Sequence, residues 1–469
     1  MMYFVALLYY FFCCVVVVDA VLLLFVPYLP YYQYFPPLWN GNYQSGFSST
    51  HVRSYINSTM GKKRSRSTGN IASETSSETQ LQVLLEKKAK KGKALSKINS
   101  KKVQKKAKTT STVLLKGPKN FRQRLVCSLL SGKAVKIEEI RSRDERPGLR
   151  PFEANLLRLL DKLTNGTKIE INVTGTTLYF RPGFITGGKI KHDCGTERAI
   201  GYYLEALIPL SLFAKNPVKA TLQGITNDNY DLSVDLIRTA LLPGLQNVFG
   251  LPASLQLKIQ ARGAPPNGGG EVIFTSPLVK QIKPIYFTDE GKIKRMRGLA
   301  YSTRVSPQTA NRMVDSARGL LNHWIPDVYI YTDHYKGEES GKSPGFGLCL
   351  VSESTTGVLL SAEEMAMGKQ ASLPESLGRV SAEKLCNEIS SGGCVDTSCQ
   401  SIYFLLMAIS EESVSKIRAG KLSTYSIQFL RHLQDFFAVT FKVKADTETN
   451  TILLSCLGAG LKNFSKKST

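Results

Sequence analysis

The stretch Arg262-Gly263-Ala264-Pro265-Pro266-Asn267-Gly268-Gly269-Gly270-Glu271-Val272 separates two apolar segments that alternate like strands, residues 255–259 and 272–274. This pattern predicts a strand, a glycine-rich turn and a second strand. Glycine has no Cβ, so a ligand can approach the three consecutive backbone N–H groups closely. Arg262 carries a planar guanidinium suited to phosphate. Two interpretations remain open: a backbone cradle for an anion, or a long hairpin loop.

Short strands and single helices recur on both sides of this stretch. Apolar spacing predicts a helix over 151–163, and a second helix over 234–249 that is bent near Pro243-Gly244. Strands are expected over 120–127, 135–140, 168–173, 177–180 and 218–222. The recurrence predicts an α/β or α+β fold built from repeated units, and it argues against one Rossmann sheet.

The charge of the chain predicts an anionic partner. The 469 residues, enough for two to three domains, carry a formal net charge of +24. Residues 53–108 hold 16 Lys and Arg against 3 Glu, and residues 109–469 hold 45 basic and 33 acidic residues. The folded part is therefore basic without the tail, which favours nucleic acid as the partner. Nine scattered cysteines without a CxxC pair predict reduced, mostly buried thiols of an intracellular protein and no metal site.

Two N-terminal segments differ from the rest in composition. Residues 1–50 begin with a very apolar stretch over 1–40, for which three interpretations compete: a membrane anchor, a cleaved signal peptide, or translated sequence outside the working protein. The third is favoured because nothing downstream resembles a secreted or membrane protein. Residues 51–111 form a Ser- and Lys-rich basic tail, for which we expect disorder or a fraying helix. This tail serves nuclear import or RNA contact, or it is a solvated tail with no specific role.

Two further features of the sequence, a P-loop-like run and the histidines, do not indicate a catalytic site. The run Gly337-Glu338-Glu339-Ser340-Gly341-Lys342-Ser343 is one residue short of a P-loop, and Pro344-Gly345 follows where a helix must begin. It is expected to be a polar surface loop between strands. The five histidines lie in no recognisable catalytic triad. His432 and Arg431 are expected to face away from the apolar stripe of their helix.

Residues 112–469 resemble the RNA 3′-terminal phosphate cyclases, and most of all their cyclase-like relatives in eukaryotic ribosome assembly. The glycine-rich run 262–272 carries the resemblance, together with residues 120–124, 136–142, 175–177, 181–183, 298–307, 340–347 and 458–460. The resemblance implies a large domain of three βαβαββ-type units over 112–288 and 387–469. It also implies a smaller α/β domain inserted over 289–386.

The chain departs from the cyclases at the residues that do their chemistry. The family forms an adenylate on a histidine in a Leu-Thr-x-His-Thr context, and the matching stretch here is Leu422-Ser423-Thr424-Tyr425-Ser426. A phenol with a pKa of about 10 is a poor nucleophile at neutral pH. The Gly-Gly-Gly-Gln element that helps hold the nucleotide is replaced by Gly117-Pro118-Lys119-Asn120. These two losses predict a protein without cyclase activity and without a cofactor.

An endonuclease role suggested for the cyclase-like group rests on an Arg-Asp-x-Lys patch, and only its arginine is retained in Arg431-His432-Leu433-Gln434. The resemblance therefore predicts a non-catalytic factor of small-subunit ribosome biogenesis in the nucleus and nucleolus. Its expected partners are a ribosome-assembly GTPase, pre-rRNA and the small-subunit processing complex, with no membrane. The alternatives are an RNA-processing enzyme, either an endonuclease using Arg431 or a residual cyclase, and a membrane protein anchored by residues 1–26. Anion or RNA contact is expected at Arg262, Gly268, Gly269, Gly270, Arg122, Arg124 and Arg181.

Overall fold

The computed structural model describes residues 112–366 and 373–463. The predictions for residues 1–50 and 51–111 therefore lie outside the described residues. The first structural unit contains β1 (Val113–Lys116), α2 (Phe121–Ser131), β2 (Val135–Glu138), α3 (Pro151–Leu163), β4 (Lys168–Ile171) and β5 (Leu178–Arg181). Its strands form a four-stranded sheet in the order β1-β2-β5-β4, in which only β1 and β2 are parallel. The short strands β3 (Thr164–Asn165) and β6 (Phe184–Ile185) form a separate pair.

The same strand order occurs twice more. The second unit comprises β7 (Gly187–Asp193), α4 (Ile200–Leu212), β8 (Asn216–Gly224), the helical segments α5 (Val234–Leu236), η1 (Ile237–Leu241) and α6 (Leu242–Phe249), β9 (Gln256–Ala261) and β10 (Gly270–Ser276). The third comprises β11 (Tyr286–Phe287), α9 (Gln400–Ile409), β16 (Val414–Ala419), α10 (Thr424–Phe437), β17 (Lys442–Asp446) and β18 (Thr451–Leu457). Their sheets run β7-β8-β10-β9 and β11-β16-β18-β17, which confirms the predicted repeat.

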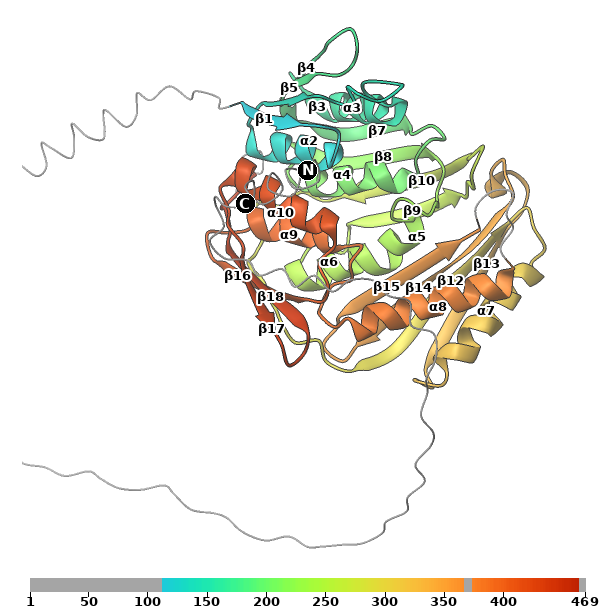
Figure 1. The fold of residues 1–469 in the computed structure, drawn as a ribbon. Coiled ribbons are helices and arrows are strands. Elements are labelled where there is room, and N and C mark those ends of the chain that lie inside the picture. The colour runs from blue at the N-terminus through green and yellow to red at the C-terminus, as the bar shows by residue number, and fades with distance from the viewer. Residues whose placement is uncertain (1–111, 367–372, 464–469) are drawn as a thin grey trace, which may run out of the picture. The chain divides into compact units, whose positions relative to one another are not determined.

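A fourth sheet is inserted between β11 and α9 of the third unit. It is built from β12 (Ile293–Thr303), α7 (Gln308–Leu321), β13 (Val328–Tyr335), η2 (Gly337–Ser340), β14 (Gly345–Ser354), β15 (Leu359–Met365) and α8 (Pro374–Ser390). The strand order is β13-β12-β14-β15, and α7 and α8 pack together on this sheet (Figure 1). The insert has a hydrophobic cluster of its own. The predicted domain limit at 386 falls inside α8, and the domain bounds remain a prediction.

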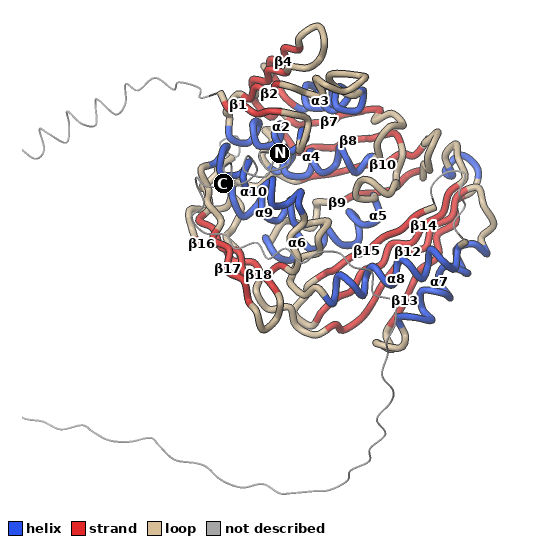
Figure 2. Tube along the Cα trace, in the orientation of Figure 1, coloured by secondary structure: helices blue, strands red, loops and turns tan. Residues whose placement is uncertain are grey.

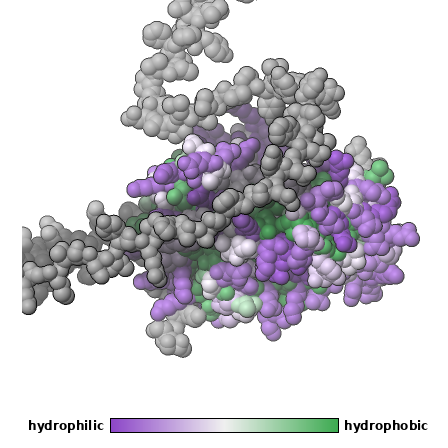
Figure 3. All heavy atoms as spheres, turned by 90° about the horizontal axis from the view of Figure 1, so that it is seen from below, coloured by the Kyte–Doolittle hydropathy of each residue, from purple (hydrophilic) through white to green (hydrophobic). Residues whose placement is uncertain are grey.

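The main core lies where helices of the three repeated units meet. Helices α2, α4, α9 and α10 pack against one another between the sheets (Figure 1). Ten residues of α2 and all ten of α9 are buried, so neither helix has a solvent-exposed face. The uncovered surface in Figure 3 is mostly hydrophilic, with apolar patches between the charged residues. Within the described ranges, no helix is long and apolar enough to cross a membrane.

Two local predictions were wrong in an instructive way. Residues 120–127, predicted as a strand, belong to helix α2 (Figure 2). The helix is buried on all sides, and its buried residues include the polar Arg122, Gln123 and Arg124, so the sequence shows only a weak helical amphipathic period. The irregularity predicted near Pro243-Gly244 lies earlier, in the π-helical turn η1, and Pro243 instead stands in the first turn of α6. The helix over 151–163 and the hairpin strands are confirmed.

The packing of α4 against the segment before α5 depends on Gly201. A Cβ built on Gly201 would overlap the carbonyl oxygen of Leu232, whereas one on Gly319 in α7 meets nothing within 4 Å. We expect Gly201→Ala to lower the free energy of unfolding by about 2 kcal/mol, because the backbone carbonyl cannot move aside freely. The control Gly319→Ala should raise it by up to about 1 kcal/mol, since alanine is the better helix former. Denaturant unfolding measures both, and equal effects of the two variants would contradict this packing.

Candidate functional site

Tyr425, the residue expected at the position of the cyclase nucleophile, lies in the first turn of α10. Ser423 caps this helix through its hydroxyl, which accepts a hydrogen bond from the N–H of Ser426 at 3.1 Å. The hydroxyl of Tyr425 lies 3.2 Å from Nη2 of Arg122. Its backbone carbonyl lies 3.5 Å from Nδ2 of Asn120, at the end of the altered Gly-Pro-Lys-Asn element. The two departures from the cyclase sequence therefore meet at one place.

Arg122 is held by an internal network and is not directed toward solvent. Its side chain is 8% exposed and forms an ion pair with Glu205 of α4. Nη1 donates to the carbonyl of Tyr202 at 3.0 Å and lies 3.8 Å from Asp231. Burial disfavours the charged guanidinium, but Glu205, Tyr425 and Asp231 together outweigh that effect and raise the pKa of Arg122 above its ordinary value. The positive charge of Arg122, which was predicted to bind an external anion, is therefore already neutralised by carboxylates of the protein.

Burial raises the pKa of the Tyr425 hydroxyl to about 12, against the lowering effect of Arg122. Almost none of this phenol is ionised at neutral pH, and a protonated phenol is a weak nucleophile. The protonated hydroxyl of Tyr425 is thus available as a hydrogen-bonding group.

A cavity of about 710 Å³ opens beside Tyr425. Acidic residues outnumber basic ones in its wall: Glu205, Asp228, Asp231, Glu363 and Glu388 against Arg122, Arg198 and Lys384. Burial raises the pKa of Glu363 to about 8. One oxygen of Glu363 accepts from the N–H of Ser233 at 3.0 Å, while Oε2 has no hydrogen-bond partner among the described residues. With Glu363 protonated at neutral pH, the wall still holds four acidic side chains against three basic ones, so it offers a triphosphate no excess of positive charge.

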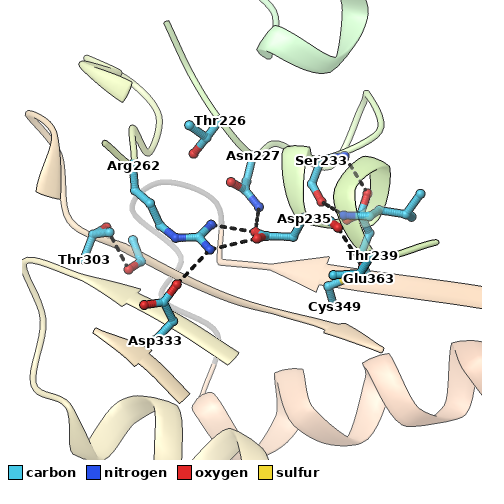
Figure 4. Close-up of polar contacts among 12 residues, drawn as sticks. Thr226, Asn227, Ser233, Asp235, Thr239, Arg262, Thr303, Asp333, Cys349 and Glu363 are labelled. Atoms are coloured by element: carbon cyan, nitrogen blue, oxygen red, sulfur yellow. Dashed lines mark hydrogen bonds and ion pairs between the residues drawn. The ribbon is translucent and has the colours of Figure 1, made fainter. Parts of the chain in front are cut away.

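Arg262 lies at the centre of a second buried network, drawn in Figure 4. Its side chain is fully buried, and it donates to both carboxylate oxygens of Asp235 at 2.6 and 2.8 Å. A third contact, of 3.3 Å, reaches Asp333 of β13. The guanidinium also stacks over the ring of Tyr301, 4.6 Å from its centroid. Burial alone would raise the pKa of Asp235, but Arg262 holds it below its usual value. Arg262 therefore serves as an internal ion-pair partner and does not face an external anion.

The glycine run is a packing junction with the inserted sheet. The N–H of Gly268 donates to Ala264, and the N–H of Asn267 donates to the hydroxyl of Ser343 at 3.1 Å. Lys342 in turn donates its N–H to the carbonyl of Gly268 at 2.9 Å. A Cβ on Gly269, whose φ is +86°, would come within 2.9 Å of the Lys342 side chain. The adjoining cavity of about 560 Å³ contains four acidic residues, Asp193, Glu271, Glu338 and Glu339, and one basic residue, Lys342.

The P-loop-like run 337–343 is thus the partner of the glycine run and only partly a surface loop. Residues 337–340 form the 3₁₀ turn η2, and Ser340 and Ser343 are buried. The carbonyl of Glu339 accepts the N–H of Arg262 at 2.8 Å. The expectation that this run joins two strands is confirmed, since it connects β13 to β14, but the expectation that it is a surface loop holds only in part.

The remaining predicted contacts lie elsewhere. Arg124 donates to the carbonyls of Gly117 at 2.7 Å and Lys116 at 3.1 Å, and so fixes the loop after β1. Its Nε lies 3.4 Å from Nε2 of His432. His432 is 2% exposed, so the prediction of a surface histidine was wrong: α10 packs this side on α2. Arg431 is exposed, as predicted, and Arg181 is exposed at the end of β5. Arg122, Arg124 and Arg262 have separate partners and form no common anion site.

Comparison with known proteins identifies the family. Residues 113–443 match the model of the RNA 3′-terminal phosphate cyclase family. The chain belongs to this family. It is 56% identical over 359 residues to a mouse RNA 3′-terminal phosphate cyclase-like protein, an alignment that spans 74% of this chain and 96% of the mouse protein. A probable cyclase-like protein of Dictyostelium discoideum is 53% identical, over 75% and 98% of the two chains. The rRNA processing protein rcl1 of Schizosaccharomyces pombe is 44% identical, over 75% and 97%.

Sequence reasoning within this family found Tyr425 and Asn120 but missed the carboxylates that define the two networks. Asp235 follows Val234 and precedes Leu236 in an otherwise apolar segment. An isolated carboxylate in such a segment is a signal for a buried cationic partner, because an unpaired buried charge is very costly. Glu205, flanked by Leu204 and Ala206 in α4, carries the same signal. The sequence alone does not indicate which arginine pairs with which carboxylate.

The buried pair between Arg262 and Asp235 gives a stability prediction. We expect Arg262→Met to lower the free energy of unfolding by about 4 kcal/mol, because Asp235 would be left buried without its cation. Adding Asp235→Leu should recover most of that loss, since no charge then remains unpaired. The control Arg297→Met breaks the half-exposed pair with Asp327 and should cost less than about 1 kcal/mol.

Denaturant unfolding of the four proteins, including the wild type, decides the matter. A loss for Arg262→Met as small as that for Arg297→Met would show that the buried pair does not hold this junction together.

Proposed function

We propose that this chain is a non-catalytic member of the cyclase family that acts in small-subunit ribosome biogenesis. It supports pre-rRNA processing to mature small-subunit rRNA within the early processing complex. It works in the nucleus and nucleolus, contacts pre-rRNA, and binds a ribosome-assembly GTPase. The family provides the scaffold. The residues around Tyr425 are the reason that we propose a non-catalytic protein.

The observation that carries this proposal is the state of Tyr425. It stands where the cyclases have their histidine, its hydroxyl pKa is raised to about 12, and Arg122 and Asn120 contact it. Covalent adenylation needs a nucleophile that is available near neutral pH. It also needs a site that tolerates a triphosphate, whereas the cavity beside Tyr425 is mainly acidic.

Two further observations support the role in ribosome assembly. The relatives with high identity along nearly their whole length are named cyclase-like proteins or, in Schizosaccharomyces pombe, an rRNA processing protein. The net charge of +24 also suits work on RNA. The endonuclease alternative gains no support from the structure, because Arg431 is exposed on α10 and its neighbour His432 is buried against Arg124.

Incubation of the full-length protein with ATP labelled on the α-phosphate tests the absence of cyclase chemistry. We expect no covalently labelled protein after denaturing electrophoresis, while an active RNA 3′-terminal phosphate cyclase treated in parallel becomes labelled. Tyr425→His should also remain unlabelled, because Asn120 and the acidic cavity wall persist around the restored imidazole.

A labelled band from the wild-type chain would overturn the proposal. A labelled band from Tyr425→His alone would show that the tyrosine is the sole block and that the nucleotide cavity is otherwise intact.

A further inference from the structure

One face of the second sheet, β7-β8-β10-β9, is covered and the other is open. The covered face carries apolar side chains such as Ala220 and Phe274, and α4 packs on it. Side chains alternate between the faces of a strand, so the intervening residues point the other way. Four of them are exposed lysines, here called the lysine face: Lys189, Lys191, Lys219 and Lys258.

The strand register places these lysines close together. Lys189 lies directly opposite Lys219 in the parallel pair of β7 and β8. Lys191 and Lys258 end one row across the sheet, with Thr221 and Ile273 between them. None of the four lysines has an ion-pair partner among residues 112–366 and 373–463. Like charges directly opposite one another destabilise a sheet, so the arrangement has a cost that folding does not explain.

Helix α3 extends the positive charge beyond the edge strand β7, which it contacts (Figure 1). Arg158 and Lys162 are exposed one turn apart on this helix. Nζ of Lys162 donates to the carbonyl of Lys191 at 3.0 Å, which places its ammonium beside the lysine face. Under β7, burial and then Lys162 lower the pKa of His192 to about 4, against the raising effect of Asp193. The histidine below the strand is therefore neutral near pH 7 and adds no charge to this region.

In the sheet of the first unit, carboxylates offset only part of the positive charge. Lys116 pairs with Glu139 at 2.6 Å, and Lys136 pairs with Glu138 at 2.7 Å. Lys168 of β4 lies opposite Arg181 of β5. Both are exposed and have no ion-pair partner in the described part of the chain, so carboxylates offset two of the lysines of this sheet and not the third. In the second sheet the acidic residues Asp193 and Glu271 lie at one end, beside the glycine run, and leave the four lysines unopposed.

We propose that the lysine face, extended by Arg158 and Lys162, binds the sugar–phosphate backbone of single-stranded RNA. This inference rests on the proposed function and names the surface through which pre-rRNA would be held. Ammonium groups are compact, strongly hydrated point charges that contact phosphates without reading bases. The expected binding is therefore independent of sequence and strongly dependent on salt.

The test compares two double variants of the full-length chain. Lys189→Gln/Lys219→Gln removes the opposed pair from the lysine face. Lys442→Gln/Lys444→Gln removes two lysines of β17 that are also exposed and also have no ion-pair partner in the described part of the chain. Fluorescence anisotropy with a labelled oligouridylate gives the affinity at several salt concentrations. The basic tail contributes equally in all three proteins, so the differences between them are the readout.

We expect Lys189→Gln/Lys219→Gln to bind about tenfold more weakly at 0.1 M salt and to lower the slope of log K against log salt by about 1.4. Its melting temperature should stay the same or rise, because a repulsive pair is removed. The β17 variant should bind like the wild type. A loss of binding without a loss of stability separates an RNA contact from a structural role.

Equal affinities of the wild type and Lys189→Gln/Lys219→Gln would overturn the lysine face, as would an equal loss in both double variants. The proposal would also be overturned if Lys189→Gln/Lys219→Gln kept its affinity for oligouridylate but lost binding of labelled poly-glutamate. That result would identify an acidic polypeptide as the partner. None of these outcomes bears on the ATP-labelling experiment, so failure of this surface is distinguishable from failure of the proposed function.

Discussion

The buried ion pair between Arg262 and Asp235 constrains this structure more than any other single contact. A guanidinium without solvent access is tolerable only when carboxylates and aromatic faces surround it. Asp235 comes from α5, Asp333 from β13 and Tyr301 from β12, so satisfying one arginine fixes the second repeated unit against the inserted sheet. The glycine run begins directly after this anchor. Its small residues let the backbones of 263, 268–270 and 341 approach one another.

The former reaction centre follows the same principle with different residues. Arg122 lies among Glu205, Asp231 and the hydroxyl of Tyr425, so the charge that could meet a phosphate is satisfied within the protein. Asn120 joins the same group through the carbonyl of Tyr425. Arg122 and Arg262 were both predicted to contact an anion, and in both networks the guanidinium is directed into the protein. The anion contact that we propose for this chain lies instead on the lysine face of the second sheet.

Local features could be predicted from the sequence, whereas features set by tertiary packing could not. Helix α3 has an amphipathic period and a proline start, and its bounds were predicted correctly. The hairpin of β9 and β10 was predicted from alternation around glycines. Helix α2 was missed because it is buried on all sides and carries no such period. The burial of His432 and the choice of Asp235 for Arg262 depend on residues far along the chain. Tyr425 was found because a family motif fixes what should stand there.

We propose that the Tyr425 hydroxyl takes no part in a reaction. This can be tested by measuring mature small-subunit rRNA in cells whose only copy of this chain carries Tyr425→Phe. This substitution removes the hydroxyl and keeps the ring, so it separates packing from chemistry. The account predicts that depletion of the chain lowers mature small-subunit rRNA and that Tyr425→Phe, present at normal protein levels, restores it fully. A Tyr425→Phe strain as deficient as the depleted one would contradict the account, because the hydroxyl would then take part in the reaction.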